Sequence, residues 1–160
     1  MACVIINMGS NLGDRRLMLS KAMRRVGLEF GPFEMSHAVE SMPEGFDSAN
    51  PFLNLAMIFN TDLQPAEVLR KLQEIEKELS DGPHRDETGG YIDRELDIDI
   101  MAVDDLIIDT PDLCIPHPRL AERRFFLEPL REIAPGWKHP VTGLTADDML
   151  AKLPGGNGAE

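Results

Sequence analysis

The stretch Leu96-Asp97-Ile98-Asp99-Ile100 alternates apolar and acidic residues without a break. This alternation has the period of a β-strand, in which successive side chains point to opposite faces. Leu96, Ile98 and Ile100 would then enter a core, while Asp97 and Asp99 share the other face. The pattern therefore requires a sheet that buries one face at this point and offers polar groups on the other.

The strand pattern recurs at other places in the chain. Short runs of β-branched, aromatic and other apolar residues favour extended structure when turn residues flank them. On this basis we predict the strands 3–7, 34–39, 52–60, 96–103 and 106–108. The last of these follows a turn at Asp104-Asp105 and is expected to return along the strand before it.

Helical periodicity appears between the predicted strands. Apolar residues spaced by three and four positions follow Asp14, which is a suitable N-cap, and Gly27 is expected to end this first helix. A second helix is predicted to begin at Pro65, since proline is favoured in the first turn. The segment 119–130 is expected to be partly helical, and 145–153 to form a short final helix.

The order β-α-β-β-α-β predicts an α+β fold: a ferredoxin-like sandwich with helices on one face of the sheet and extra C-terminal elements. We expect residues 1–153 to form a single domain and 154–160 to be a disordered tail. The segments 41–51 and 81–93 are rich in glycine, proline or charge, and are predicted to be long loops.

The chain has 16 basic and 28 acidic residues, which gives a net charge of −12. Such a surface repels nucleic acid and anionic membrane, so neither is expected as a partner. Nothing at the N-terminus resembles a signal peptide, and no stretch is long and apolar enough to span a membrane. Cys3 and Cys114 lie far apart and are expected to be reduced thiols. We therefore expect a cytoplasmic protein, and we also expect it to be a monomer.

Asp97 and Asp99 are candidate ligands for a divalent metal ion. Two carboxylates on one face of a strand lie about 7 Å apart and can hold magnesium through oxygen. Magnesium bound in this way bridges polyphosphate oxygens. The alternative is an acidic strand that simply faces solvent. Glu95 has the same parity, and would either add a third carboxylate or face water.

Arginines gather near the acidic pair and after it. Arginine suits phosphate because its planar fork donates bidentate hydrogen bonds and keeps its charge. The candidates are Arg94, Arg119, Arg123, Arg124 and Arg131. Solvated surface arginines are the alternative, and we favour it for Arg124 and Arg131.

Two further residues are candidates for a site. His117 lies between Pro116 and Pro118, which stiffen the loop and fix the direction of the imidazole, so it can donate to a phosphate oxygen. A structural histidine is the alternative. Glu76 falls on the apolar stripe of the second helix, where a carboxylate is costly unless it is paired. An arginine or a ligand group is its expected partner; otherwise it flanks the stripe and reaches solvent.

Taken together, these motifs resemble the 6-hydroxymethyl-7,8-dihydropterin pyrophosphokinase family. The resemblance runs from Ile5 to about Gly143. It is carried by Gly9-Ser10-Asn11-Leu12-Gly13-Asp14, by Asp93-Arg94-Glu95-Leu96-Asp97-Ile98-Asp99-Ile100, by Ile115-Pro116-His117-Pro118-Arg119, by Arg123-Arg124-Phe125 and by Glu132-Ile133-Ala134-Pro135.

The resemblance implies a ferredoxin-like fold and the transfer of pyrophosphate from ATP to a reduced pterin in folate biosynthesis. It implies two magnesium ions held by Asp97 and Asp99. The catalytic residues would be Arg85, Arg94, Asp97, Asp99, His117 and Arg123. The nucleotide would be bound by Gln73, Glu76, Arg94, Ile100, His117 and Arg123. The pterin pocket would be lined by Ser41, Met42, Pro43, Phe52, Asn54 and Phe125.

Three positions differ from the usual pattern of that family. Trp-Gly-Pro-Arg often precedes the acidic pair, whereas this chain has Tyr91-Ile92-Asp93-Arg94. Two arginines are typical of the catalytic loop, whereas here Arg85 stands beside His84. An aromatic residue commonly follows the histidine, and here it is Pro118.

Two other functions are compatible with the same motifs. A two-metal nucleotidyltransferase also joins a Gly-Ser turn to an Asp-x-Asp strand, but it would release pyrophosphate where the pyrophosphokinase releases AMP. A ferredoxin-like regulatory module would bind a small ligand without turnover. That module gives no reason for two carboxylates and several arginines to converge, so we rank it last.

Overall fold

The apolar runs of the sequence form one five-stranded antiparallel sheet. A computed structural model describes residues 1–41, 51–80 and 95–154. Of the predicted site residues, Met42, Pro43, Arg85 and Arg94 lie outside this part of the chain, as do most of the two predicted loops and all but the first residue of the predicted tail.

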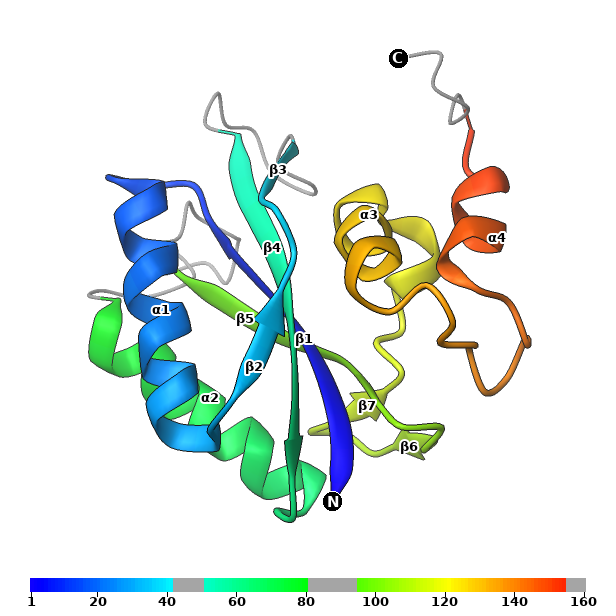
Figure 1. The fold of residues 1–160 in the computed structure, drawn as a ribbon, viewed down its shortest axis with the longest axis horizontal. Coiled ribbons are helices and arrows are strands. Elements are labelled where there is room, and N and C mark those ends of the chain that lie inside the picture. The colour runs from blue at the N-terminus through cyan, green and yellow to red at the C-terminus, as the bar shows by residue number, and fades with distance from the viewer. Residues whose placement is uncertain (42–50, 81–94, 155–160) are drawn as a thin grey trace.

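The central strand is β1 (Ala2–Ser10), which pairs with β4 (Phe52–Thr61) on one side and β5 (Asp97–Val103) on the other. The order of the main path is β2-β4-β1-β5 (Figure 1). Strands β2 (Phe33–Met35) and β3 (Val39–Ser41) both pair with β4. This arrangement confirms the predicted α+β, ferredoxin-like fold.

The predicted strand 34–39 is divided in two by an extra residue. Residues 36–38 lie opposite only two residues of β4, 55 and 56, so the ladder is interrupted. The buried Ser36 replaces part of the ladder, because its hydroxyl accepts a hydrogen bond from the Ala56 amide at 2.9 Å. The interruption also frees the His37 amide to donate to a carboxylate oxygen of Glu132 at 2.9 Å.

The first helix, α1 (Arg15–Phe30), begins as predicted and ends later. The carboxylate of Asp14 caps it by accepting from the Leu17 amide. The predicted end at Gly27 is wrong, because α1 continues to Gly31, whose φ of 95° suits glycine. Gly27 has a packing role instead: a Cβ there would lie 2.8 Å from the Phe33 ring.

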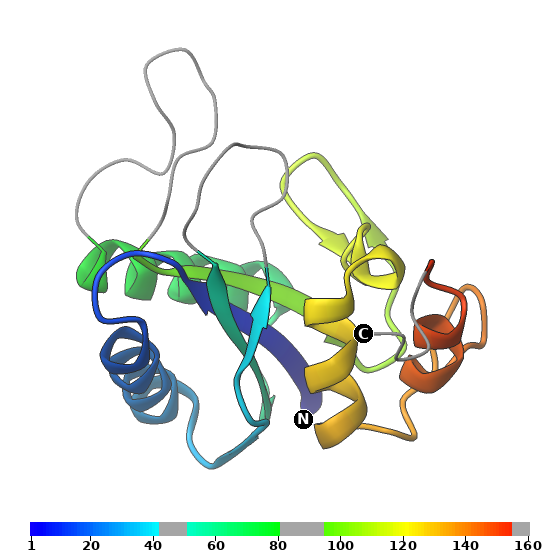
Figure 2. The same ribbon diagram turned by 90° about the horizontal axis from the view of Figure 1, so that it is seen from above.

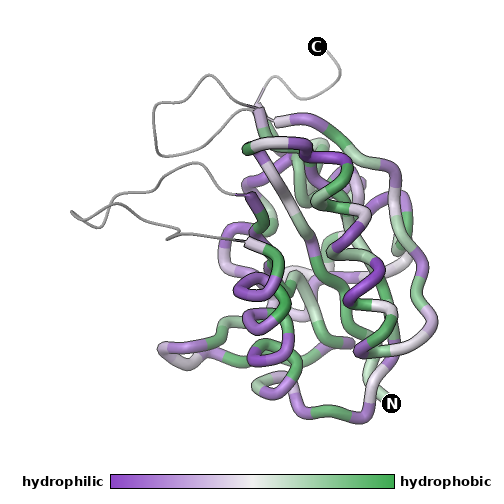
Figure 3. Tube along the Cα trace, turned by 90° about the vertical axis from the view of Figure 1, so that its left-hand side faces the viewer, coloured by the Kyte–Doolittle hydropathy of each residue, from purple (hydrophilic) through white to green (hydrophobic). Residues whose placement is uncertain are grey.

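The second helix, α2 (Pro65–Leu79), begins at the predicted proline and lies beside α1 on one face of the sheet (Figures 1 and 2). Figure 3 shows hydrophobic and hydrophilic residues alternating along the helical turns, as expected of helices with one buried side. Within the described residues, no helix combines the length and the apolar character that a membrane span requires.

The opposite face of the sheet is also covered, by α3 (Arg124–Ile133), and α4 (Ala146–Ala151) packs against α3 (Figures 1 and 2). The helices predicted on one face therefore form only one of the two layers that pack against the sheet. The odd positions of β1 supply Ile5 to this second layer, and its even positions face α1 and α2. The second core is formed by Ile5, Ala56, Met101, Ala102, Leu120, Phe126, Leu127, Leu130, Ala146, Met149 and Leu150.

The segment after β5 does not return along it, so the predicted hairpin strand 106–108 is wrong. Strand β6 (Ile108–Asp109) pairs instead with β7 (Cys114–Ile115) in a separate two-stranded sheet. Asp104 holds the turn because its backbone adopts a φ of 49° and its carboxylate accepts from the Cys3 amide. A single turn of 3-10 helix, η1 (Leu120–Glu122), then leads into α3.

The second core predicts a large cost for truncation within α3. The side chain of Leu127 is 0% exposed, so Leu127→Ala should lower the free energy of unfolding by about 2–5 kcal/mol. Leu28 on α1 is 73% exposed, and Leu28→Ala should change it by less than about 0.5 kcal/mol. Urea denaturation of both variants measures the difference, and equal effects would contradict a second core.

Candidate active site

Three neighbouring strands bring polar and small residues together on the α3 face of the sheet. In β1, Gly9 lies opposite Asn54 of β4 and opposite Asp97 of β5. Two residues earlier, Asn7 lies opposite Asp99. Because alternate residues share a face, these five side-chain positions form one surface at one end of the sheet.

Gly9 leaves room at the centre of this surface. A Cβ at this position would lie 2.6 Å from the Asn54 side-chain oxygen and 3.5 Å from the Phe52 ring. Any larger residue would therefore displace the Asn54 side chain, whereas the distance to Phe52 is an ordinary van der Waals contact. The glycine of the Gly-Ser turn thus lets two predicted pterin residues lie close to the acidic strand.

The alternation predicted for β5 is confirmed. Leu96, Ile98 and Ile100 are buried in the core beneath α1 and α2. Asp97 and Asp99 are half-buried and lie on the opposite face, toward α3. Glu95 lies just before the strand and is also half-buried. The acidic pair therefore borders the site and is not simply a solvent-facing edge.

His117 approaches the acidic strand from the loop after β7. Its Nε2 lies 3.9 Å from an Asp99 carboxylate oxygen. Its Nδ1 accepts a hydrogen bond from the Arg119 amide at 3.1 Å, which places the proton on Nε2. Burial lowers the pKa of His117 to about 4, and the positive charges of Arg123 and Arg119 add to this effect. A neutral imidazole therefore directs an N–H donor toward the acidic pair.

Aromatic rings hold Arg123 and His117 at the beginning of α3. The Arg123 guanidinium carbon lies 5.4 Å from the centre of the Phe125 ring and 5.1 Å from that of Phe126. The His117 ring meets Phe126 edge to face at 5.0 Å. These contacts hold the Arg123 guanidinium near His117, whose imidazole lies beside the Asp99 carboxylate.

The other candidate arginines within the described residues pair with nearby acids. Arg131 is exposed and lies 3.5 Å from an Asp147 carboxylate oxygen, as expected of a surface residue. The half-buried Arg124 pairs with Glu128 one turn along α3. Arg119 pairs with Glu122. Of the candidate arginines that the structure describes, Arg123 is the one whose guanidinium lies over two phenylalanine rings.

The predicted pterin residues Ser41, Phe52, Asn54 and Phe125 lie on three elements of this end of the molecule. Asn54 is buried, and its amide donates to the Ser41 hydroxyl at 3.0 Å. Phe52 lies opposite Ser41 in the β3–β4 ladder. Phe125 is the second residue of α3, and its half-buried side chain packs against the second core. The buried Asn54 amide and the Phe52 ring both lie next to Gly9.

Asn7 belongs to the site although the sequence analysis did not select it. It is buried, and its side-chain amide donates to the Phe125 carbonyl at 3.3 Å. This bond joins the central strand to the start of α3. The available signal was its parity, because Asn7 interrupts an apolar strand on the same face as Gly9.

The predicted nucleotide residues Gln73, Glu76 and Ile100 lie along the outer edge of β5. A Glu76 carboxylate oxygen accepts a hydrogen bond from the Ile98 amide at 2.6 Å. The Ile98 amide is therefore a partner of this carboxylate that the sequence analysis did not predict. Ile100 has the same parity as Ile98, so its backbone groups also face the outer edge. Gln73 is exposed one helical turn before Glu76.

The donor set of the described residues fits magnesium bound together with a polyphosphate. In that part of the chain, no group of three or more His, Cys, Asp or Glu side chains is arranged to hold a metal ion by itself. Magnesium commonly uses one or two carboxylates together with substrate phosphates and water. Asp97 and Asp99 meet this requirement because both are on one face of a paired strand.

A comparison with protein families gives a match over most of the chain. The model of the 7,8-dihydro-6-hydroxymethylpterin-pyrophosphokinase family matches residues 5–135. These residues include most of β1 and all of α1, β4, α2, β5 and α3. The match ends before Gly143, the expected limit of the resemblance.

Two curated relatives match at similar levels. The 2-amino-4-hydroxy-6-hydroxymethyldihydropteridine pyrophosphokinase of Porphyromonas gingivalis is 39% identical over 143 residues, which cover 88% of this chain and 95% of the relative. The protein of the same name from Aquifex aeolicus is 40% identical over 142 residues, which cover 88% of this chain and 86% of the relative.

A solved structure shares the fold. The Plasmodium falciparum HPPK-DHPS crystal structure matches with a TM-score of 0.73 over 94% of this chain, at 14% sequence identity. The chain spans 44% of the length of that structure. At this identity the likeness is one of fold, and it agrees with the strand order described above.

The Glu76 contact predicts a role in stability. Glu76→Ala leaves the Ile98 amide without its carboxylate partner and should lower the free energy of unfolding by about 1–3 kcal/mol. Glu76→Gln retains an acceptor oxygen and should cost less. Glu74→Ala is the matched control, because its exposed pair with Arg70 is worth only about 0.3–0.5 kcal/mol. Equal unfolding curves for Glu76→Ala and Glu74→Ala would contradict the anchoring role.

Proposed function

This chain belongs to the 7,8-dihydro-6-hydroxymethylpterin-pyrophosphokinase family, and we propose that it transfers pyrophosphate from ATP to the hydroxymethyl group of 6-hydroxymethyl-7,8-dihydropterin. One observation carries the proposal. The carboxylates of Asp97 and Asp99 lie on the same face as the buried Asn54, and His117 and Arg123 approach that face from α3 and its preceding loop. Residues 1–153 would act as one catalytic domain, as a monomer.

The pterin would bind between Phe52 and Phe125. A flat bicyclic ring is well matched by two aromatic faces. The Asn54 amide offers a donor and an acceptor to the edge of the ring, and its bond to Ser41 holds it in one orientation. Met42 and Pro43, which lie outside the described residues, complete the proposed pocket.

The triphosphate would lie over β5, between the acidic strand and the start of α3. Arg123 supplies positive charge there, and the His117 Nε2–H supplies a neutral donor. Arg94 and Arg85 are proposed to contribute further charge, and both lie outside the described residues. The nucleotide end would extend along the outer edge of β5, toward Ile100, Gln73 and Glu76.

Asp97 and Asp99 would hold two magnesium ions with the help of substrate phosphates. Magnesium bound there would offset the negative charge of the triphosphate. Asp97 would also act on the acceptor, because it lies opposite Gly9, which in turn lies opposite Asn54. From this position Asp97 would orient the pterin hydroxyl or accept its proton.

In the proposed reaction, the pterin hydroxyl oxygen attacks the β-phosphorus of ATP. The bond from that phosphorus to the α–β bridging oxygen breaks, and AMP leaves with the bridging oxygen. His117 and Arg123 would hold the phosphate oxygens in place during this exchange. The products are AMP and the pterin diphosphate.

Product analysis tests this function. The protein is incubated with ATP, magnesium and 6-hydroxymethyl-7,8-dihydropterin, and the nucleotides are separated. We expect AMP to appear in step with a pterin diphosphate, and no turnover when EDTA replaces magnesium. ADP would indicate an ordinary kinase, free pyrophosphate a nucleotidyltransferase, and an unchanged nucleotide a binding module.

Asp97→Asn and Asp99→Asn should each lower turnover by at least about 100-fold with the melting transition retained. Asp105→Asn, on an exposed turn, is the matched control.

The orientation of His117 gives a second functional prediction. A glutamine side chain can place its amide near the position of Nε2, whereas asparagine places its amide near Nδ1. His117→Gln should therefore keep turnover within about tenfold, and His117→Asn should lose about 100-fold. Steady-state rates at saturating ATP and pterin measure the difference. If asparagine supported more turnover than glutamine, Nε2–H would not be the functional donor.

A further inference from the structure

Arg15 bridges two strand ends that are distant from it in the sequence. Its Nη1 donates to the Pro51 carbonyl at 3.0 Å, and its Nη2 donates to a Glu40 carboxylate oxygen at 2.9 Å. Arg15 itself is the first residue of α1, directly after the cap at Asp14. One guanidinium group therefore joins the start of α1 to the end of β3 and the beginning of β4.

Both acceptors lie next to residues of the proposed pterin pocket. Glu40 precedes Ser41 in β3, and Pro51 precedes Phe52 in β4. Ser41 and Phe52 are themselves opposite one another in the ladder. The spacing of these two strand ends therefore determines where the Ser41 hydroxyl meets the Asn54 amide, and where the Phe52 ring lies over Gly9.

The chemistry of the contact favours a fixed geometry over a loose surface pair. The Arg15 side chain is only 28% exposed, whereas that of Glu40 is 58% exposed. The ion pair alone would be weak at that exposure. The bond to the Pro51 carbonyl differs because its acceptor belongs to the backbone and cannot rotate away. The planar fork of arginine serves both acceptors at once, which an ammonium group on a flexible stem does not reproduce.

We propose that Arg15 is a positioning residue for the pterin half of the active site. It holds the ends of β3 and β4 at the separation that places Ser41, Phe52 and Asn54 for the ring. Its two guanidinium hydrogen bonds go to Pro51 and Glu40, and not to the acidic pair of β5. The inference rests on the proposed function, because it assigns these three residues to the pterin.

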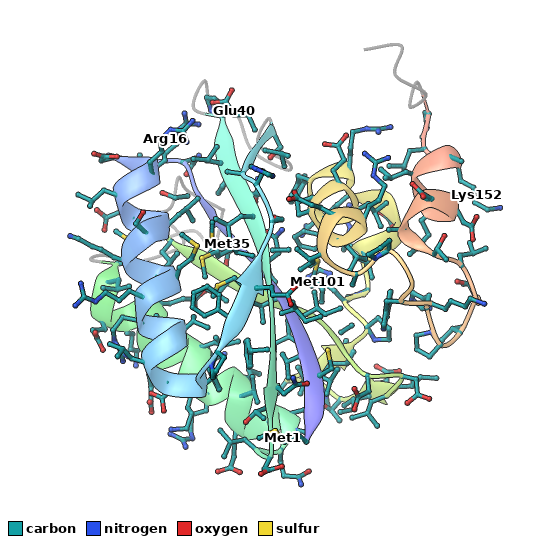
Figure 4. All side chains as sticks on the ribbon, in the orientation of Figure 1. Met1, Arg16, Met35, Glu40, Met101 and Lys152 are labelled. Carbon is teal, nitrogen blue, oxygen red and sulfur yellow. The ribbon has the colours of Figure 1, made fainter. Side chains whose placement is uncertain are left out.

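The neighbouring residue Arg16 provides a matched control. It carries the same charge on the same turn of α1, but its side chain is exposed. Figure 4 labels Arg16 and Glu40 at the same end of the molecule. A substitution at Arg16 therefore changes the local charge as much as one at Arg15 without removing the bridge.

The first test separates the two substrates. Arg15→Gln should raise KM for the pterin about tenfold, because it removes a charged donor from a partly buried backbone acceptor. KM for ATP should stay within about twofold, since the bridge acts on the pterin side. Arg15→Lys should give an intermediate pterin KM, and Glu40→Ala a rise of only about twofold, because the Pro51 bond remains. Arg16→Gln should leave kcat and both KM values unchanged. Equal pterin KM values for Arg15→Gln and Arg16→Gln, or an equal rise in both KM values, would overturn the proposal.

A second measurement does not depend on turnover. The backbone amides of residues 39–41 and 52–54 should exchange hydrogen faster in Arg15→Gln than in Arg16→Gln. The amides of the β1–β5 ladder should exchange at the same rate in both variants. If exchange is faster in Arg15→Gln but the wild-type protein shows no turnover, the proposed function is refuted and the bridge stands. Unchanged exchange would refute the bridge even if the protein forms AMP and the pterin diphosphate.

Discussion

The central position of β1 is the constraint on which the rest of the structure depends. Because β1 is paired with both β4 and β5, every residue from Val4 to Gly9 has a fixed neighbour on both sides. The even positions fill the core beneath α1 and α2, and the odd positions face α3. Along the strand, the residues at the odd positions change in character, from the apolar Ile5 to the polar Asn7 and then to Gly9, which has no side chain. The same strand therefore anchors the second core at one end and supplies the floor of the site at the other.

The electrostatics of the site oppose those of the whole chain. The net charge is −12, yet Arg123 lies close enough to His117 to affect its pKa, and His117 lies beside the Asp99 carboxylate. A protonated His117 would have to be buried near Arg123 and Arg119, which is why its pKa falls to about 4. The positive charge near His117 is therefore carried by arginine, which stays protonated at any physiological pH. His117 is neutral and offers an oriented Nε2–H donor.

Long-range contacts join the elements around the site into one frame. The Glu132 carboxylate holds the His37 amide at the interruption between β2 and β3, and the Asn7 amide holds the Phe125 carbonyl. Glu76 closes the outer edge of β5 at Ile98, and Arg15 joins the ends of β3 and β4. Each bond connects segments at least 22 residues apart. Together they explain how short strands and a short helix can present side chains at reproducible distances.

The sequence by itself determined the strand and helix order, the alternation of β5 and the cap at Asp14, because each follows from local periodicity or from a hydrogen bond within one turn. It also indicated the family, through motifs whose order along the chain is distinctive. Only the tertiary structure decided that α3 covers the second face, that Gly27 continues a helix against Phe33, and that the strand after β5 pairs with β7. Asn7 and Arg15 likewise gained their partners only on folding. Those partners are 118 and 36 residues away, and no local pattern encodes a contact at that distance.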